Sequence, residues 1–345
     1  MKSSTNTIYN PPWTHVYAER EALSYPIAQT VISALAKRGS QVIEIAQYMD
    51  VFGRTHQSFP AQKASQALIL AVKHGNFLYP GAAVCQDFGN SNFYYTSFAM
   101  NCPFDCEYCY LQGMYSSANI VLFVNQEDYF SEIQNALAEH PVYLCISYDT
   151  DLPALEGLTG MIRRYLAFAS GQQTLTTELR TKSAISVTPL ADGFSADTLS
   201  RVIMAYSLSP DSIISRFEHR TPVLSKRLLA VREAHAAGFP VRLCFDPLLS
   251  VPDFKEVYGA FLAQVREALH DIPVLDASIG VFRISDGYLK RMRRNRPDSA
   301  LLQYPFSNEN HVCSYGARGM EMVDFVKGEL AGFLPKNRIF TSFTS

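Results

Sequence analysis

Three cysteines stand close together in the chain, Cys102, Cys106 and Cys109, with the spacing C-x3-C-x2-C. They follow a short apolar and aromatic run at 93–100, so a loop directly after a strand is expected to carry them. Three thiolates on one loop can converge on an iron–sulfur cluster, which normally takes four protein ligands. The nearest later cysteine is Cys145, too far along the chain to belong to the same loop. The spacing therefore predicts a [4Fe-4S] cluster with one iron open to a substrate or cofactor.

The alternatives to such a cluster are a zinc site and a chance spacing. Structural zinc takes four ligands from paired Cys or His motifs, and no second pair follows at a suitable distance. The spacing is typical of radical S-adenosylmethionine enzymes, in which the open iron chelates the amino and carboxylate groups of the methionine moiety. Tyr108 occupies the aromatic position of their C-x3-C-x-aromatic-C pattern. We therefore expect a [4Fe-4S] cluster and S-adenosylmethionine as cofactors.

Length and composition indicate the architecture of the chain and the compartment in which it works. A chain of 345 residues with 48% hydrophobic residues suits one α/β barrel with an additional N-terminal segment. Seven cysteines, an odd number with three clustered, favour a reducing compartment over a disulfide framework, so a cytoplasmic protein is expected. The N-terminus has no signal-peptide pattern and its apolar runs are too short for a membrane span, so no membrane partner is expected.

The first part of the chain, 1–92, is predicted to be a small α/β extension. Residues 1–20 show no periodicity and are expected to form a poorly ordered lead-in. From Ala22, apolar residues at helical spacing (Ile27, Val31, Ile32 and Leu35) predict a helix that ends near Gly39. Strands are predicted at 40–46 and 67–72.

The middle of the chain, 93–285, alternates strand-like and helix-like segments, which is typical of a parallel sheet or barrel. Six strands are predicted, at 93–99, 142–147, 174–181, 202–208, 241–245 and 274–282. Helices are predicted between them at 126–139, 153–169, 195–201, 222–237 and 253–269. The fold class is therefore α/β, a partial (β/α)6 barrel of the radical S-adenosylmethionine type. A C-terminal segment at 286–345 is predicted to hold a basic helix.

In a (β/α) barrel the catalytic side chains lie at the carboxyl ends of the strands. The first predicted strand leads into the cysteine loop, and the next four end at Cys145 and Ser147, Lys182, Ser207 and Asp246. Taken singly, a cysteine in an apolar strand is usually a small buried hydrophobe, and a lysine or serine at a strand end is usually solvated. Their convergence at one mouth favours a functional site. Three other cysteines have no such support and are taken as structural: Cys85, Cys244 and Cys313.

Five stretches, in order along the chain, carry a family resemblance. They are 21–26 (EALSYP, compared with ALEYP), 106–112 (CEYCYLQ, with CxYCYLQ), 145–147 (CIS, with CTS), 181–182 (TK) and 206–210 (YSLSP, with WSLNP). The chain thus resembles the spore photoproduct lyase family of radical enzymes over most of its length. Members of that family reverse the thymine dimer 5-thyminyl-5,6-dihydrothymine in ultraviolet-damaged spore DNA.

The resemblance implies roles for particular residues. A 5′-deoxyadenosyl radical removes hydrogen from C6 of the dimer, the bond between the bases breaks, and a cysteine then donates hydrogen to the product radical. By resemblance Cys145 is that donor, and Tyr108 and Tyr110 return the radical to the cofactor. Lys182 and Ser207, together with Ser147, match positions around the methionine carboxylate. The implied partners are damaged DNA and an electron donor such as flavodoxin or ferredoxin.

Two stretches bear on DNA contact. A basic run comprises Lys290, Arg291, Arg293, Arg294 and Arg296, and its plainest interpretation is a solvated helix face. The family inserts an Arg-Tyr pair of a hairpin into the lesion, whereas here Ser314 precedes Tyr315 and the nearest arginine is Arg318. Tyr148 likewise stands where the family often has Asp. The expected DNA-contacting residues are Arg291, Arg293, Arg294, Tyr315 and Arg318.

Two other functions remain open from the sequence. One is a related radical enzyme that acts on a different nucleic-acid or small-molecule substrate. The other is an iron–sulfur sensor that binds nucleic acid without turnover, although such a sensor would not need the Cys145 thiol at a strand end.

Overall fold

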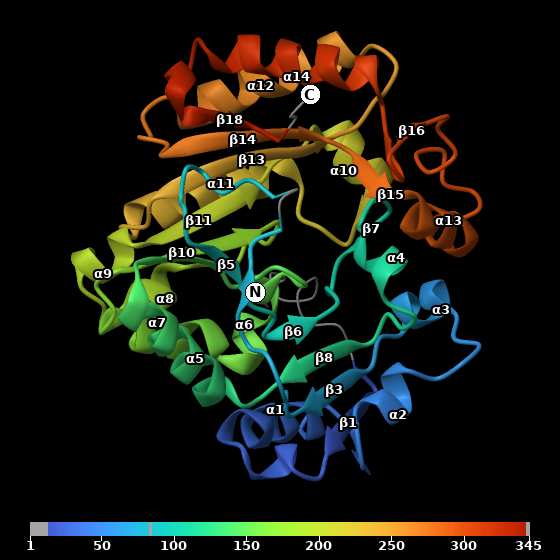
Figure 1. Cartoon of the computed structure of the whole chain (residues 1–345), viewed down its shortest axis with the longest axis vertical. Coiled ribbons are helices and arrows are strands. Elements are labelled where there is room, and N and C mark those ends of the chain that lie inside the picture. The colour runs from blue at the N-terminus through green and yellow to red at the C-terminus, as the bar shows by residue number, and fades with distance from the viewer. Residues whose placement is uncertain (1–12, 83–84, 343–345) are drawn as a thin grey trace, which may run out of the picture.

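Two curled sheets enclose the centre of the molecule (Figure 1). The computed structural model describes residues 13–82 and 85–342. The larger sheet has eight strands in the order β18-β14-β13-β11-β10-β9-β5-β4, parallel throughout except that β4 is antiparallel to β5. Its strands are β4 (Tyr79–Pro80), β5 (Phe93–Tyr95), β9 (Val142–Cys145), β10 (Leu175–Thr181), β11 (Val202–Ser207), β13 (Val241–Leu248), β14 (Asp276–Val281) and β18 (Ile339–Thr341).

The second sheet has the order β2-β1-β3-β8-β6 and takes strands from both sides of residue 92. Its strands are β1 (His15–Glu19), β2 (Gln41–Ile45), β3 (Leu68–Ala71), β6 (Ala99–Met100) and β8 (Ile120–Phe123). The expectation of a poorly ordered lead-in is wrong for β1, because Val16 and Ala18 are fully buried and the strand pairs with both β2 and β3. Residues 1–12 lie outside the described part of the chain.

The predicted strand at 93–99 is two strands in two different sheets. β5 belongs to the large sheet and β6 to the small one, and between them the Thr96 amide donates to the Cys145 carbonyl at 3.0 Å. The chain therefore crosses from one sheet to the other immediately before the cysteine loop. The other five predicted strands are present, and β8 and β18 were not predicted.

Helices cover the outer faces of the sheets, with α12 and α14 packed over the β14 end in Figure 1. The helices are α1 (Pro26–Ala36), α2 (Met49–Phe52), α3 (Phe59–Ala64), α4 (Leu111–Met114), α5 (Gln126–Glu139), α6 (Leu152–Thr159), α7 (Met161–Ser170), α8 (Thr188–Ala191), α9 (Ala196–Ser200), α10 (Asp211–Phe217), α11 (Leu224–Ala236), α12 (Phe254–Leu269), α13 (Asp286–Asn295) and α14 (Ala317–Leu330). The single helix predicted at 153–169 is wrong, because the structure has two helices there, α6 and α7, which are separated by Gly160. The φ of Gly160 is +64°, in the left-handed region, which interrupts a right-handed helix. None of the described helices is long and apolar enough to cross a membrane.

The C-terminal segment contains the predicted hairpin and basic helix. Strands β16 (Ser307–Glu309) and β17 (Val312–Ser314) form the hairpin, and β15 (Arg283–Ser285) pairs with β17. Helix α13 packs against α4, the short helix that follows the cysteine loop (Figure 1).

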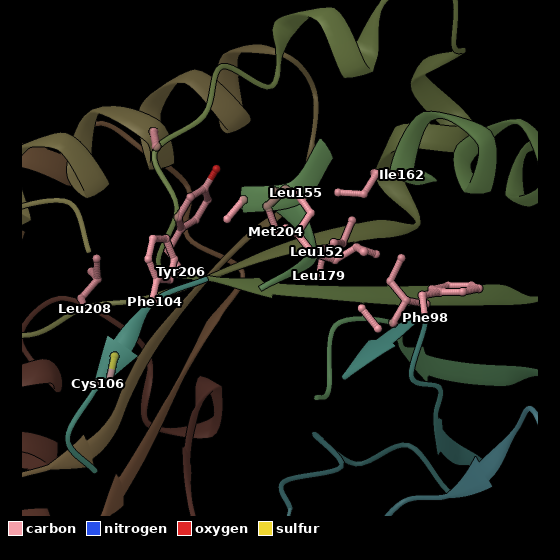
Figure 2. Close-up of a cluster of buried hydrophobic side chains, with 14 of the residues drawn as sticks. Phe98, Phe104, Cys106, Leu152, Leu155, Ile162, Leu179, Met204, Tyr206 and Leu208 are labelled. Carbon is pink, nitrogen blue, oxygen red and sulfur yellow. The ribbon is translucent and has the colours of Figure 1, made fainter. Parts of the chain in front are cut away.

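One continuous hydrophobic core joins the two sheets and reaches the cysteine loop. Figure 2 shows part of it, with Phe98 and Ile162 at one end of the view and Phe104, Leu208 and Cys106 at the other. The cysteine loop is therefore packed into the core rather than exposed on the surface.

Candidate active site

The three predicted ligands Cys102, Cys106 and Cys109 line one cavity. The loop that carries them begins at Asn101, whose φ is +65° and whose side-chain amide donates to the Ser117 and Asn119 carbonyls at 2.8 Å. Asparagine tolerates this left-handed backbone better than most residues, which explains its position at the start of the loop.

Side chains from outside the loop hold its backbone in place. The buried Lys63 ammonium donates to the carbonyl oxygens of Cys102 and Phe104, each at 2.6 Å. The Gln112 amide donates to the Glu107 carbonyl at 2.6 Å and to the Cys106 carbonyl at 3.4 Å. Each contact satisfies backbone acceptors that the loop leaves without a secondary-structure partner.

The loop is also fixed by a short antiparallel pair of strands. Strand β7 (Asp105–Cys106) pairs with β12 (Glu218–His219), and the Glu107 amide donates to the Phe217 carbonyl at 2.8 Å. The second cysteine is thereby tied to the segment that follows β11.

An all-sulfur donor set around one cavity fits an iron–sulfur cluster. Burial raises the pKa of the Cys102 thiol to about 12 and raises the pKa of the other two thiols as well, so ligation would release protons. In the described residues, no three His, Cys, Asp or Glu side chains are placed to hold a single metal ion. In a cluster each thiolate binds its own iron, so thiols spread around a cavity suit a cluster better than a lone ion.

A buried ionic network lies beside Cys106. The Tyr108 hydroxyl donates to Glu218 Oε1 at 2.5 Å, and the Ser209 hydroxyl donates to the same oxygen at 2.8 Å. Glu218 Oε2 pairs with Arg227 at 2.5 Å, with both side chains fully buried. Burial alone would raise the pKa of Glu218, but the charge of Arg227 holds it below its usual value.

Lys182 reaches the same place from the end of β10. Its ammonium lies 5.4 Å from the centre of the Tyr108 ring, and its backbone amide donates to Asp151 Oδ2 at 2.7 Å. Burial would lower the pKa of Lys182, but the neighbouring Cys106 sulfur and the Glu218 carboxylate raise it, so the ammonium keeps its charge. The structure thus brings Lys182 to the cysteine loop.

The two predicted serines occupy different environments. The Ser147 hydroxyl accepts from the Arg180 amide and donates to the Arg180 carbonyl, both at 2.9 Å, so it joins the end of β9 to β10. Ser207 is buried at the end of β11, and its carbonyl accepts from Arg227 at 3.0 Å.

Cys145 lies at the end of β9, buried, and pairs in register with Tyr95 of β5 and Glu178 of β10. Burial raises the pKa of its thiol well above the usual value, and Glu178 adds to the effect. The thiol therefore remains S–H rather than thiolate at neutral pH.

The two predicted relay tyrosines point to different partners. Tyr108 is bound to Glu218, whereas the Tyr110 hydroxyl donates to the Tyr148 carbonyl at 2.9 Å and to Asp149 Oδ1 at 3.0 Å. The Ser97 hydroxyl also donates to Asp149. Tyr110 is thus the tyrosine of the loop that meets the segment just beyond Cys145.

The basic run is divided between inward and outward contacts. Arg293 donates to the carbonyls of Leu302 and Tyr304 at 2.7 and 3.1 Å. Arg296 pairs with Asp105 and donates to Gln112 Oε1 at 3.1 Å. Arg291 donates to the Met114 carbonyl at 3.3 Å.

Lys290 and Arg294 are the exposed members of the run, and they line an open pocket between α13 and the hairpin. This pocket also includes Phe306 and Asn308.

The two residues expected to act at the hairpin lie at its base. Tyr315 is buried with Tyr304 and Phe306, at ring-centroid distances of 4.8 and 5.2 Å. Arg318 pairs with Glu321 at 3.1 Å. The exposed hairpin tip carries Asn310 and His311 instead.

Several residues of the site were not predicted from the sequence. Asp246, a predicted strand end, accepts from Arg180 at 3.2 Å and from Ser278 at 2.9 Å, which places Arg180 in the barrel interior. The unpredicted residues are Lys63, Gln112, Asp149, Arg180, Glu218 and Arg227. The sequence does contain a signal for Arg180. It lies two residues from both Glu178 and Lys182, so the three side chains share one face of the strand.

Three features together define a radical S-adenosylmethionine enzyme. They are a partial barrel, a three-cysteine loop with a buried lysine beside it at the carboxyl ends of the strands, and a thiol at the end of β9. The family model for spore photoproduct lyase matches residues 10–304. The chain therefore belongs to the spore photoproduct lyase family, and it is a radical S-adenosylmethionine lyase.

Individual relatives agree with this assignment. The spore photoproduct lyase of Bacillus subtilis (strain 168) is 26% identical over 270 residues, covering 74% of this chain and 75% of the relative. That of Geobacillus sp. (strain Y412MC61) is 22% identical over 267 residues, covering 76% and 75%.

Solved structures of spore photoproduct lyase share the fold. A cysteine-to-serine variant superposes with a TM-score of 0.83 at 19% identity, covering 98% of this chain and 100% of that chain. A double variant with bound AdoMet and dinucleoside spore photoproduct superposes with a TM-score of 0.82 at 19% identity, with the same coverage. The prediction of a radical-enzyme partial barrel is confirmed.

Proposed function

We propose that this chain repairs DNA by reversing 5-thyminyl-5,6-dihydrothymine to two thymines. The observation that carries the proposal is the placement of a protonated, buried thiol, Cys145, at the end of β9, which pairs with β5, the last strand of the large sheet before the cysteine loop. A generic radical enzyme needs the loop but has no use for a hydrogen donor at this position.

The chain's own residues have separate tasks in this reaction. Cys102, Cys106 and Cys109 would hold the cluster, which together with S-adenosylmethionine supplies a 5′-deoxyadenosyl radical that removes hydrogen from C6 of the dimer. Lys182 would bind the methionine carboxylate through a charge-assisted hydrogen bond, with Ser207 lining the site. Ser147 contributes by fixing the end of β9, and hence Cys145, against β10.

Cys145 then quenches the thymine radical that remains after the bases separate. Hydrogen-atom donation requires an intact S–H bond, and the raised pKa of Cys145 keeps the thiol protonated throughout the physiological range. Tyr110, beside Cys109 in the loop and hydrogen-bonded next to the end of β9, would return the radical. Tyr108 would act from the Glu218 side of the loop.

Damaged DNA would approach the carboxyl ends of the strands, where the loops meet. A damaged step costs less to extrude from the duplex than an intact one. Lys290 and Arg294 are free to meet phosphates, with Arg291 beside them, whereas Arg293 would act by holding the segment that contains Leu302 and Tyr304.

Tyr315 and Arg318 would support the hairpin from its base as it contacts the lesion. We further propose a cytoplasmic setting with a one-electron donor such as flavodoxin or ferredoxin, supported by seven cysteines with free thiols.

The test is anaerobic reconstitution of the cluster, followed by incubation with S-adenosylmethionine, dithionite and dimer-containing oligonucleotide. Release of repaired thymine, measured by chromatography, is the expected result. Cofactor cleavage without thymine would instead favour a radical enzyme with another substrate. DNA binding without cofactor cleavage would favour a sensor.

A further inference from the structure

A second thiol and a third tyrosine lie beside the end of β9. The Tyr148 hydroxyl is 3.2 Å from the Cys85 sulfur, within hydrogen-bonding distance. The Tyr148 ring stacks on Tyr95, with ring centroids 4.1 Å apart and planes inclined by 26°. Tyr95 is the register partner of Cys145 across β5 and β9. The Cys85–Tyr148 pair is therefore packed against the strand pair that carries the hydrogen donor.

The same pair is joined to the cysteine loop through Tyr110. The Tyr110 hydroxyl donates to the backbone carbonyl of Tyr148, and the two ring centroids are 6.3 Å apart. The hydroxyl of Tyr108 points elsewhere, into the Glu218 network. Tyr148 is consequently a tyrosine that contacts Tyr110 on the Cys145 side of the loop.

We propose that Tyr148 and Cys85 are relay residues, which carry a hydrogen atom from Tyr110 to Cys145 after each repair event. This inference rests on the proposed function, since the relay is needed only if Cys145 donates its hydrogen to a thymine radical. Two residues are thereby added to the return path, and Cys85, for which the sequence offers no functional signal, takes part in the reaction.

The relay balances step by step. Once Cys145 has lost its hydrogen, the Cys85 S–H bond breaks as the Cys145 S–H bond forms, and then the Tyr148 O–H bond breaks as the Cys85 S–H bond re-forms. The Tyr110 O–H bond breaks last, which restores Tyr148. The radical on Tyr110 would then take hydrogen from a C–H bond of the 5′-deoxyadenosine made earlier in the same turnover. This gives back the 5′-deoxyadenosyl radical from which the cofactor is rebuilt, so no external oxidant or reductant is consumed.

The surroundings favour transfer of whole hydrogen atoms. Each step moves a proton and an electron together, so no net charge appears among buried groups, where it would be costly. Burial raises the pKa of Tyr148, which keeps its hydroxyl protonated until the electron also leaves.

The test compares variants that remove one hydrogen from the path. Tyr148→Phe keeps the ring that stacks on Tyr95 and deletes only the hydroxyl, and Cys85→Ala deletes the thiol. Both variants should still give native thymine, because Cys145 is intact. The ratio of 5′-deoxyadenosine to repaired thymine should rise several-fold in each, because the cofactor is consumed instead of recycled.

The double variant separates a relay from independent structural effects. Residues that act in series should give a double variant no worse than the larger single effect, whereas unrelated effects should add. Tyr79→Phe is the matched control, because Tyr79 stacks on Tyr95 at 5.2 Å but its hydroxyl bonds to Lys73 and to the Asn76 carbonyl. Its ratio should stay at the wild-type value.

A second readout uses the protein without cluster or cofactor. The labelling rate of Cys85 by a maleimide, followed by peptide mass spectrometry, should change in Tyr148→Phe and stay unchanged in Tyr79→Phe. Wild-type product ratios in both relay variants, or an unchanged Cys85 labelling rate, would overturn the relay while leaving the repair function intact. A wild-type protein that cleaves cofactor but releases no thymine would overturn the proposed function, and the relay with it.

Discussion

At the residue scale, the four thiols of the site need opposite protonation states. Cys102, Cys106 and Cys109 must lose their protons to bind iron, whereas Cys145 must keep its proton to donate a hydrogen atom. Burial raises the pKa of all four thiols, so the three cluster ligands lose their protons only when they bind metal. The loop geometry makes this distinction, because it places three thiols around one cavity and leaves Cys145 on a neighbouring strand.

Replacing the donor should change how the reaction ends. Cys145→Ala should retain the cluster and the first hydrogen abstraction, because neither step uses this thiol. The product radical should then be trapped by reductant, giving adducts in place of clean thymine and consuming the cofactor. Product chromatography measures this outcome. Native thymine at the wild-type rate would make Cys145 an ordinary buried cysteine.

A stability measurement tests the buried pair beside the loop. Arg227→Met leaves the Glu218 carboxylate buried without its partner, and such a loss costs about 3–5 kcal/mol in the free energy of unfolding. Urea unfolding of the cofactor-free protein gives the value. Arg232→Met, on the same helix, breaks the exposed pair with Asp271 and should change stability little. Similar effects in both variants would contradict the role assigned to the buried pair.

At the element scale, the sequence patterns predict the regular helices and strands well, but they do not predict the points at which a helix or strand is interrupted. The predicted helix at 126–139 has the bounds found in the structure, because its apolar spacing and flanking residues agree. Gly160 divides the next predicted helix, since apolar residues on both sides conceal a left-handed turn. The run at 93–99 looks like one strand because apolar and aromatic residues occur in both halves, whereas the sheet that each half joins is set by long-range pairing.

The contact between α4 and α13 depends on one glycine. A Cβ at Gly113 would lie 2.6 Å from Tyr288 Cβ and 3.0 Å from Tyr288 Cα. Gly113→Ala should therefore force the helices apart and destabilise the protein by about 1–3 kcal/mol, as overpacking does. Gly157→Ala, in open space on α6, should instead be neutral or stabilise by up to about 1 kcal/mol. Urea unfolding compares the two, and a tolerated Gly113→Ala would contradict the close packing.

At the scale of the whole molecule, the cluster loop was predictable and its supports were not. The cysteine spacing is local in sequence, whereas Lys63 and Glu218 contact the loop from 41 and 110 residues away in the chain, and Arg227 in turn holds Glu218. A buried charge cannot be recognised from sequence when its partner is distant, because each alone resembles a surface residue. The basic run illustrates the converse, since two of its arginines are bound inside the protein.

The division of the basic run predicts a salt-dependent DNA contact. Lys290→Gln combined with Arg294→Gln should weaken binding to dimer-containing DNA and flatten the dependence of affinity on salt. The reason is that a protein with fewer phosphate contacts releases fewer counterions from the DNA when it binds. Fluorescence anisotropy at several salt concentrations measures both. Lys226→Gln combined with Lys255→Gln, on α11 and α12, is the control with the same charge change. Equal effects from both pairs would indicate general charge rather than a docking site.

The central claim is that this chain removes hydrogen from C6 of the thymine dimer and ends the reaction through Cys145. The most direct measurement uses dimer DNA deuterated at C6, incubated anaerobically with the reconstituted enzyme, dithionite and S-adenosylmethionine, with mass spectrometry of the nucleosides. We expect deuterium in 5′-deoxyadenosine together with released thymine, and an increase in labelled 5′-deoxyadenosine per thymine when Cys145 is replaced by alanine. Thymine release with no deuterium in the cofactor products, or labelled 5′-deoxyadenosine with no thymine, would contradict it.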